Sequence, residues 1–326
     1  MKKLLSLLLA VSMLLTMTFV LASCGGDESE SASESASESA SESASESESD
    51  SASESESDSA SESESDSASE SESESASESE SEAEDTATNG TLKMVTNAYF
   101  APYEYFEGNE IVGIDVDIAK AVAAKLGYKL EVESINFDSL ITTVNSGAAD
   151  FAMAGMTVTD ERKLEVDFTL SYATGCQMLV VTKDSPLASL DDLVAYPADD
   201  DGNYITEGNT ATKVGVQLGT TGALYAEWDG YQVVPYTTAN DAIIALKNGD
   251  VDCVMIDSAP AQNFVDNNED LRMIDGEEAY IVEEYAACVK KGNTELLNKL
   301  NGAIAELIAD GTIEAIIEQY IPAESK

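Results

Sequence analysis

The sequence predicts an α/β fold made of two lobes, and two observations support it. Apolar segments of strand length alternate with segments of helical periodicity between about residues 91 and 173. The same alternation starts again at Val214 and continues into the C-terminal part of the chain. Strands that alternate with helices in this way form sheets with crossover connections. Two separate runs of this kind indicate two sheets, and therefore two lobes.

The elements expected in the first run are strands at 92–96, 128–134 and 151–156, and helices at 112–126 and 137–145. The longer helix carries apolar residues at helical spacing and ends before a glycine. Ligands of open α/β sheets bind beyond the carboxyl ends of the strands. Asn97, Phe100, Phe137 and Thr157 fall in or near such ends. A ligand site is therefore expected at this edge of the first sheet.

The elements expected in the rest of the chain are strands at 176–182, 214–216, 232–235 and 251–256, and helices at 220–228, 240–247, 293–309 and 312–320. A polar, turn-rich segment at 197–212 interrupts this run. We expect it to be a surface loop, because it breaks no apolar pattern. Cys176, Cys253 and Cys288 each lie in an apolar segment, which predicts buried thiols. One disulfide with one free thiol is the alternative.

The segment from Asp150 to Gly175, DFAMAGMTVTDERKLEVDFTLSYATG, contains a strand-to-helix junction with polar side chains. Arg162, one of only two arginines in the chain, falls at this junction. Free backbone N–H groups, a helix N-terminus and a guanidinium together favour a carboxylate. The alternative is a surface arginine that pairs with Asp160 or Glu165, an arrangement of little energetic value.

The motif AGMTVTDERKLEVDF within this segment resembles the signature of bacterial extracellular solute-binding proteins of family 3, the receptors of polar amino-acid ABC transporters. Further similar motifs occur in the family's order: FAPY at 100–103, GIDVDIA at 113–119, VGVQLGTTG at 214–222 and DCVMID at 252–257. The resemblance covers about residues 91–322. Several motifs in one order form a much more specific signal than one short pattern.

The resemblance implies a periplasmic-binding-protein-like clamshell (type II), in which two α/β lobes are joined by two hinge strands. The hinge crossings are expected near Tyr172–Cys176 and Ile281–Tyr285. Lobe 1 is then discontinuous, at about 91–173 and 286–326, and lobe 2 spans about 177–280. The implied function is the extracellular substrate-binding component of an ABC importer, which captures a polar amino acid by closing and delivers it to the membrane permease.

The resemblance also implies how an α-amino acid is held. Arg162 binds the carboxylate, together with backbone N–H groups near Thr157 and Thr221, and Thr220 is also expected among the ligand-binding residues. Asp257 binds the ammonium, together with the carbonyl of Gly155 and the hydroxyl of Thr157. These roles give the carboxylate a cation and the ammonium an anion, one from each lobe.

Asp257 has an alternative role as the N-cap of the following helix, since Asp before Ser-Ala-Pro suits a cap. Phe100 and Phe137 match family positions that wall the ligand's side chain. Asn97 and Gln217 match positions that contact the end of that side chain. Members that bind cationic amino acids commonly have an acid at the position of Asn97. A neutral polar or sulfur-containing amino acid therefore fits best.

Residues 1–90 lie outside the predicted core. A basic start, an apolar stretch and the lipobox-like Leu21-Ala22-Ser23-Cys24 predict a lipoprotein signal at 1–23. Cys24 would then carry acyl chains that anchor the protein to the outer face of the cell membrane. Residues 24–90 consist almost entirely of Ser, Glu, Ala and Asp up to Asp85. Such a segment buries too little apolar surface to fold, which predicts a disordered tether.

The composition excludes several classes of function. The chain has no histidine, which excludes Ser-His-Asp and Cys-His catalysis and zinc sites built with histidine. Its net charge of −47 argues against nucleic acid as a partner. No cofactor, metal or catalytic residue is expected. The expected partners are an amino-acid ligand and an ABC transporter permease, and the protein is expected to be a monomer.

Two other functions stay open from the sequence. The first is an enzyme on the same fold, similar to cyclohexadienyl dehydratase, which would need a general acid with a shifted pKa. The one acid that we place in the cleft is Asp257, which is already assigned to the ammonium. The second is a surface antigen or adhesin, which suits the tether but leaves the cleft motifs unexplained.

Overall fold

The structure is a computed structural model that describes residues 89–274, 280 and 282–322. The predicted signal 1–23, the lipidated Cys24 and the tether up to residue 88 lie outside the described residues. So do residue 281 of the second predicted hinge crossing and residues 323–326. All described residues belong to one compact unit of the chain.

The first sheet has the strand order β5-β1-β6-β13-β7. Its strands are β1 (Thr91–Thr96), β5 (Lys129–Ser134), β6 (Phe151–Ala152), β7 (Val166–Gly175) and β13 (Glu283–Lys290). β1 is parallel to β5 and β6, whereas β13 is antiparallel to β6 and β7. The sheet therefore contains a late segment of the chain, as the discontinuous lobe in the prediction requires.

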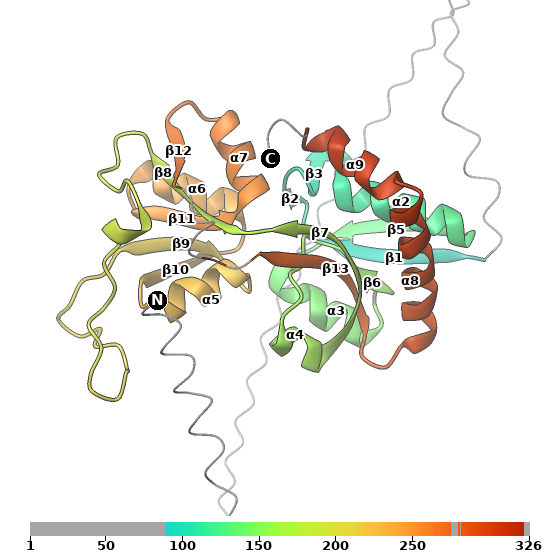
Figure 1. The fold of residues 1–326 in the computed structure, drawn as a ribbon, viewed down its shortest axis with the longest axis horizontal. Coiled ribbons are helices and arrows are strands. Elements are labelled where there is room, and N and C mark those ends of the chain that lie inside the picture. The colour runs from blue at the N-terminus through green and yellow to red at the C-terminus, as the bar shows by residue number, and fades with distance from the viewer. Residues whose placement is uncertain (1–88, 275–279, 281, 323–326) are drawn as a thin grey trace, which may run out of the picture. The chain divides into compact units, whose positions relative to one another are not determined.

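Helices cover both faces of this sheet (Figure 1). They are α2 (Ile114–Leu126), α3 (Leu140–Ser146), α4 (Asp160–Glu165), α8 (Thr294–Ala309) and α9 (Thr312–Tyr320). Met94 of β1 packs in the cluster that contains the buried faces of α2 and α8. Its neighbour Val95 packs with α3 in a separate cluster. Successive strand residues point to opposite faces, so one strand contributes to both layers of core.

The second sheet has the order β10-β9-β11-β8-β12. Its strands are β8 (Gln177–Thr182), β9 (Lys213–Gln217), β10 (Gln232–Tyr236), β11 (Cys253–Asp257) and β12 (Leu271–Ile274). β9 is parallel to β10 and β11, and β8 is antiparallel to β11 and β12. The helices packed on it are α5 (Thr221–Trp228), α6 (Ala239–Asn248) and α7 (Ser258–Asp266). This is a second α/β layer system, as the sequence predicts.

Short elements complete the described fold. β2 (Tyr99–Phe100), β3 (Glu104–Glu107) and β4 (Glu110–Val112) form a small antiparallel sheet. The 3₁₀ turns are η1 (Phe137–Ser139) and η2 (Leu190–Asp192). No helix in the described ranges is long and apolar enough to cross a membrane. The segment 197–212 is almost wholly exposed and contains no regular helix or strand, which agrees with the predicted surface loop.

The strands β7 and β13 run side by side across the middle of the two-lobed fold (Figure 1). Their register pairs Gly175 with Glu283 and Ala173 with Tyr285. β7 is followed directly by β8 of the second sheet, and β13 belongs to the first sheet. Paired strands at this place give a two-stranded connection between the sheets, which is what a hinge requires.

The structure corrects three boundaries. The strand predicted at 151–156 is only Phe151–Ala152, because the chain leaves the ladder and reaches positive φ (51°) at Gly155. The helix predicted from 112 begins at Ile114, since Gly113 has a φ of 128° that no helix accepts. The short helix at 137–145 is a 3₁₀ turn followed by α3.

The cysteines are buried, as predicted, and no disulfide joins Cys176, Cys253 and Cys288. Cys253 and Cys288 lie in β11 and β13, whereas Cys176 lies just before β8. The alternative of one disulfide among these three is therefore wrong.

Gly175→Ala is expected to destabilise the fold. A Cβ there would lie 2.1 Å from the hydroxyl oxygen of Tyr285 and 2.7 Å from its Cζ. Tyr285 is fully buried and donates its hydroxyl to Asp257, so it cannot move away freely. Overpacking of this kind costs about 1–3 kcal/mol, which denaturant unfolding would measure.

The matched control is Gly302→Ala in α8, where a Cβ meets nothing within 4 Å. Glycine in a helix interior is worse than alanine by about 0.5–1 kcal/mol, so this variant should be more stable. Equal stability of Gly175→Ala and the unmodified protein would show that the two hinge strands are not packed as described.

Candidate functional site

The site is built at the carboxyl ends of parallel strands in both sheets. Asn97 directly follows β1, and Gly155 lies shortly after β6. Gln217 is the last residue of β9, and Asp257 is the last residue of β11. Side chains at such ends point beyond the sheet edge, where open α/β sheets bind ligands. The two sheets thus present their binding edges to one shared cleft.

Nearly all residues predicted for the site line one hollow between the lobes. The lining residues are Phe100, Phe137, Ala154, Gly155, Thr157, Arg162, Gln217, Thr220, Thr221 and Asp257. Asn97 is the one predicted residue outside this lining. It is buried behind Gln217, whose Nε2 donates to Asn97 Oδ1 over 2.9 Å. The prediction from sequence therefore selected one spatial cluster.

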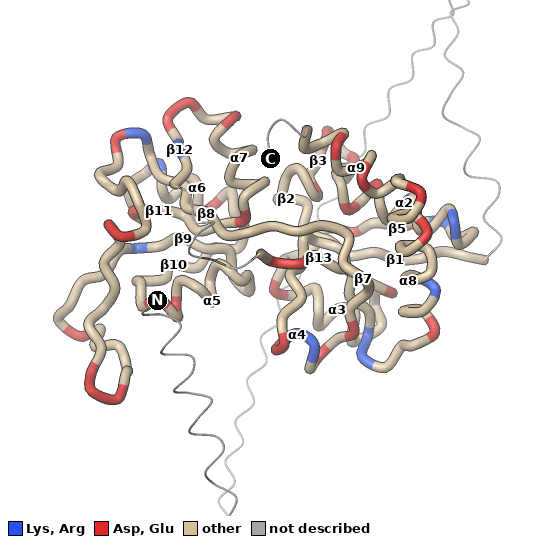
Figure 2. Tube along the Cα trace, viewed as in Figure 1, with Lys and Arg blue, Asp and Glu red and all other residues tan. Residues whose placement is uncertain are grey.

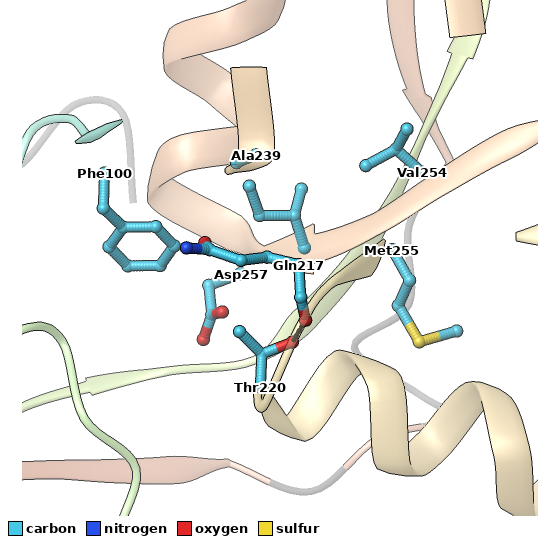
Figure 3. Close-up of a pocket in the computed structure, with 8 residues that line it drawn as sticks. Phe100, Gln217, Thr220, Ala239, Val254, Met255 and Asp257 are labelled. Carbon is cyan, nitrogen blue, oxygen red and sulfur yellow. Dashed lines mark hydrogen bonds between the residues drawn. The ribbon is translucent and has the colours of Figure 1, made fainter. Parts of the chain in front are cut away.

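A second, adjoining hollow extends the cleft into the second lobe (Figure 3). Its walls are Phe100, Gln217, Thr220, Ala239, Val254, Met255, Ile256 and Asp257. Figure 3 shows the Gln217 amide and the Asp257 carboxylate beside the ring of Phe100. Charged and polar groups thus stand at one end of this space, and aliphatic side chains at the other.

Arg162 points into the cleft and not along the surface. Its Nη1 donates to the carbonyl of Thr157 over 2.6 Å, and its Nη2 to the carbonyl of Gly219 over 2.9 Å. Its Cζ lies 5.4 Å from the centre of the Phe137 ring, which gives a cation–π contact. Asp160 pairs with Lys163 instead. The alternative of a surface ion pair for Arg162 is therefore wrong.

The local chain explains this orientation of the guanidinium. Thr159 is the N-cap of α4, and its Oγ1 accepts the backbone N–H of Arg162 over 3.1 Å. The cap fixes the first turn of a helix that is otherwise too short to be stable alone. Burial lowers the pKa of the guanidinium, while nearby acids, Glu283 first, raise it. Arginine stays charged in either case.

Asp257 is almost fully buried and accepts a hydrogen bond from the hydroxyl of Tyr285. It occupies the N-cap position of α7, but its side chain makes no capping hydrogen bond. Its position at the helix start therefore does not account for the orientation of its carboxylate. The carboxylate faces the same hollow as Arg162.

Gly155 is required by the ring of Phe100. It has a φ of 51°, and a Cβ there would lie 2.8 Å from Phe100 Cε1. Only glycine combines that backbone angle with such close packing. The N–H of Gly155 donates to Asp115 Oδ2 over 2.8 Å, which fixes the loop that carries Thr157.

A buried carboxyl pair supports this loop from behind. Asp115 Oδ2 also accepts the hydroxyl of Tyr172 over 2.8 Å, and the carboxyl group of Glu104 lies near enough to Asp115 to interact with it electrostatically. Both carboxyl groups are fully buried, and no basic group reaches either one among the described residues. Two neighbouring carboxyl groups in a buried place disfavour a second negative charge, so one of them holds a proton. Burial, followed by Asp115, raises the pKa of Glu104 well above its ordinary value, so Glu104 is the protonated partner.

Sequence reasoning missed Glu283 and Tyr285, which lie in the hinge strand β13, and Gln177, which begins β8 shortly after the end of β7. Glu283 Oε2 accepts the hydroxyl of Thr157 over 2.6 Å and the hydroxyl of Thr221 over 2.9 Å. Gln177 Nε2 donates to Glu283 Oε1 over 3.3 Å. Glu283 and Tyr285 stand two residues apart in a strand, so they point to the same side. That spacing was the available signal, because the segment was predicted as a crossing.

The cleft therefore holds two buried acids close together. Burial, followed by the neighbouring Glu283, raises the pKa of Asp257 to about 7, against the hydrogen bonds from Tyr285 and Gln177 that lower it. Burial likewise raises the pKa of Asp115 to about 7. Within the described ranges, no cluster of His, Cys, Asp and Glu side chains is arranged to hold a metal ion. The groups present can bind a zwitterion: a guanidinium for its anion, and a carboxylate with hydroxyls for its cation.

The stability of the protein is expected to fall as pH rises from 5 to 8. Asp115 and Asp257 have folded-state pKa values raised to about 7, above the ordinary value of an aspartate in the unfolded chain. The folded state therefore binds more protons in this range, so its stabilisation is complete at low pH and is lost through pH 7. The chain has no histidine, so few other groups titrate here.

Calorimetric scans should show Tm falling by at least about 4 °C, since about 1 kcal/mol corresponds to about 2–4 °C at this size. Asp257→Asn should flatten the dependence, while Asp184→Asn, at an exposed position, should leave it unchanged. A Tm that rises between pH 5 and 8 would contradict the buried, proton-binding carboxyl groups.

Comparisons with known proteins agree with this geometry. The model of the family "bacterial extracellular solute-binding proteins, family 3" matches residues 92–323. The arginine-binding extracellular protein ArtP of Bacillus subtilis (strain 168) is 34% identical over 237 residues, which is 72% of this chain and 87% of that protein. The L-cystine-binding protein TcyJ of Escherichia coli (strain K12) is 29% identical over 244 residues, 72% of this chain and 84% of that protein.

A solved structure of an ancestral arginine-binding protein bound to glutamine is also similar. It has a TM-score of 0.62 and 36% sequence identity, and the match covers 71% of this chain and 97% of that one. These relatives are binding proteins and not enzymes, which answers the enzyme alternative raised from the sequence. The two-lobed α/β fold, the cleft and the matched motifs lead to one conclusion: the chain belongs to the bacterial extracellular solute-binding proteins of family 3.

Proposed function

We propose that this protein captures an α-amino acid with a polar side chain and delivers it to an ABC transporter permease. The observation that carries the proposal is the pair Arg162 and Asp257, which line one hollow from opposite lobes. A zwitterion needs a cation and an anion at a fixed spacing, and here each lobe supplies one of them. A solute that bridges both lobes stabilises their closed arrangement.

In this proposal Arg162 binds the ligand's carboxylate. Two of its five N–H groups already donate to the carbonyls of Thr157 and Gly219. The others can donate to an anion, assisted by the N–H groups at the start of α5, where Thr220 is the N-cap and Thr221 the first residue. The ammonium binds Asp257, the carbonyl of Gly155 and the hydroxyl of Thr157.

The ligand's side chain extends between Phe100 and Phe137 toward Asn97 and Gln217. Asn97 Nδ2 donates to the carbonyl of Ile135 over 2.8 Å, and its Oδ1 accepts from Gln217. Both amides are thus oriented, and neither carries charge. Aliphatic side chains, including that of Ile256, line the adjoining hollow. A neutral polar or sulfur-containing side chain suits this combination. The names of the similar proteins mention arginine, cystine and glutamine, so these three are the first ligands to test.

The same proposal places the protein on the outer face of the cell membrane. Cys24 carries the lipid after removal of residues 1–23, and residues 24–90 form the tether. Lobe 1 comprises about 91–173 and 286–326, and lobe 2 about 177–280. The protein acts as a monomer, and the permease recognises its closed form. Support comes from the lipobox-like sequence and from the acidic, aromatic-free composition of the segment that follows it.

Calorimetric titration with the twenty amino acids and cystine tests the proposal, and Arg162→Ala tests its chemistry. The variant should lose at least about 100-fold in affinity for the amino acid that binds most tightly, because about 3 kcal/mol is typical when a buried charge is left unpaired. The thermal unfolding of the variant should stay close to that of the unmodified protein.

The control is Lys163→Ala, whose ammonium is exposed and pairs with Asp160 at the surface. It should bind as the unmodified protein does. Binding by Arg162→Ala within threefold of the unmodified protein would refute the carboxylate assignment. Absence of binding by every member of the panel would refute the ligand class.

A further inference from the structure

Glu283 is a buried acid that none of the motifs identified. It begins β13, where a short acidic stretch lies between the lobes (Figure 2). Its exposed fraction is 2%. No lysine or arginine forms an ion pair with it among the described residues, although Arg162 lies near enough to interact electrostatically. A buried carboxylate needs hydrogen-bond donors, and the donors found here are hydroxyl and amide groups.

The hydroxyl donors come from both lobes and meet at one oxygen. Thr157, after β6 of the first sheet, donates to Glu283 Oε2 over 2.6 Å. Thr221, the first residue of α5 in the second lobe, donates to the same oxygen over 2.9 Å. The hydrogen bond between Thr157 and Glu283 forms only in the folded protein, because the two residues lie 126 residues apart in the sequence. Both threonines also line the hollow with Arg162 and Asp257.

These contacts determine what the two hydroxyls can offer a ligand. A hydroxyl has one proton and two lone pairs. Because each threonine gives its only proton to Glu283, its oxygen can only accept further hydrogen bonds. Gln177 Nε2 uses one such position on Thr221 Oγ1, over 3.3 Å. The remaining lone pairs can receive N–H donors, but they repel a carboxylate.

We propose that Glu283 is a positioning residue of the amino-acid site, which takes the protons of the Thr157 and Thr221 hydroxyls and thereby commits both oxygens to accept the ligand's ammonium. The inference rests on the proposed function, because it assigns the orientation in which the zwitterion binds. Glu283 also joins Thr157 of one lobe to Thr221 of the other through a single oxygen. It therefore couples the two lobes even before a ligand is considered.

Glu283→Gln is the informative variant, because it keeps the size of the side chain but replaces one accepting oxygen with a donating NH₂ group. Gln177 Nε2 donates to Oε1 of residue 283, so the carbonyl of the new amide should stay on that side. Its NH₂ group then faces the two threonines and occupies their lone pairs. The hydroxyl protons are released toward the cleft, and the oxygens are lost as acceptors for an ammonium.

The test compares L-glutamine with glutaramate, which has the same side chain and carboxylate but no ammonium. Calorimetry should show that Glu283→Gln lowers the affinity for L-glutamine by at least tenfold, while the affinity for glutaramate changes by less than threefold. The control is Glu284→Gln, the exposed neighbour, which should change neither probe. Equal losses for both probes would mean a merely structural role, and unchanged binding of L-glutamine would mean no role. Either result overturns the proposal.

A second measurement uses no ligand. Thr157→Val and Thr221→Val, singly and together, should lower Tm non-additively. The double variant should lose more than the sum of the single losses, because Glu283 Oε2 then loses both of its threonine donors. In a Glu283→Ala background, which leaves no side-chain partner for either threonine to share, the two losses should add. Additive losses with Glu283 present would refute the bridge. If L-glutamine does not bind the unmodified protein, it is not among this protein's ligands, and these unfolding measurements still decide the role of Glu283.

Discussion

An imbalance of buried charge in the cleft determines much of this structure. Asp257 and Glu283 are both almost fully buried there, and the one cationic side chain lining the described cleft is Arg162. Buried carboxylates are costly unless they are paired or hydrogen-bonded. The protein meets this requirement with Tyr285, Thr157, Thr221 and Gln177, and with a raised pKa at Asp257. A ligand that brings an ammonium completes the charge balance, which is a physical reason for the site to prefer a zwitterion.

The fold creates this imbalance by bringing distant segments to one place. Asp257 ends a strand of the second sheet, and Arg162 lies in the first turn of α4, after a strand of the first sheet. Glu283 lies on the strand that connects the lobes. Each of these groups has a hydrogen-bond partner from another segment: Arg162 donates to Gly219, Asp257 accepts from Tyr285, and Glu283 accepts from Thr157 and Thr221. Some contacts between the lobes are polar, such as Gln217 to Asn97 and Arg162 to Gly219. Polar contacts of this kind can be exchanged for water when the lobes separate.

Much of the fold could be predicted from the sequence, because its elements are encoded locally. Apolar spacing located α2, α8 and α9, and glycines with positive φ, such as Gly127, mark the helix ends. The residues lining the cleft were found because they sit in motifs that follow strands, as Gly155, Arg162 and Asp257 do. The strand expected at 151–156 was too long, since apolar residues that leave a ladder look the same as residues within it.

Interactions between distant segments could not be predicted in this way. Glu283 and Tyr285 were visible as part of a crossing strand, but their partners depend on the register between β7 and β13 and on the meeting of two lobes. The pair Asp115 and Glu104 was equally hidden. The helix starts with Ile-Asp-Val-Asp, and an acid in the first turn of a helix is normally explained by its favourable interaction with the helix N-terminus. Asp115 is instead fully buried and accepts a hydrogen bond from the N–H of Gly155.

The central claim is that a zwitterion joins the lobes through Arg162 on one side and Asp257 on the other. The most direct measurement is the distance between spin labels at exposed positions Leu164 in α4 and Glu227 in α5, each replaced by cysteine in a Cys24→Ala background. The tightest-binding amino acid should shift the distance distribution to shorter values, and Asp257→Ala should abolish that shift. Tight binding without any change in the distribution, or an equal shift in Asp257→Ala, would contradict the account.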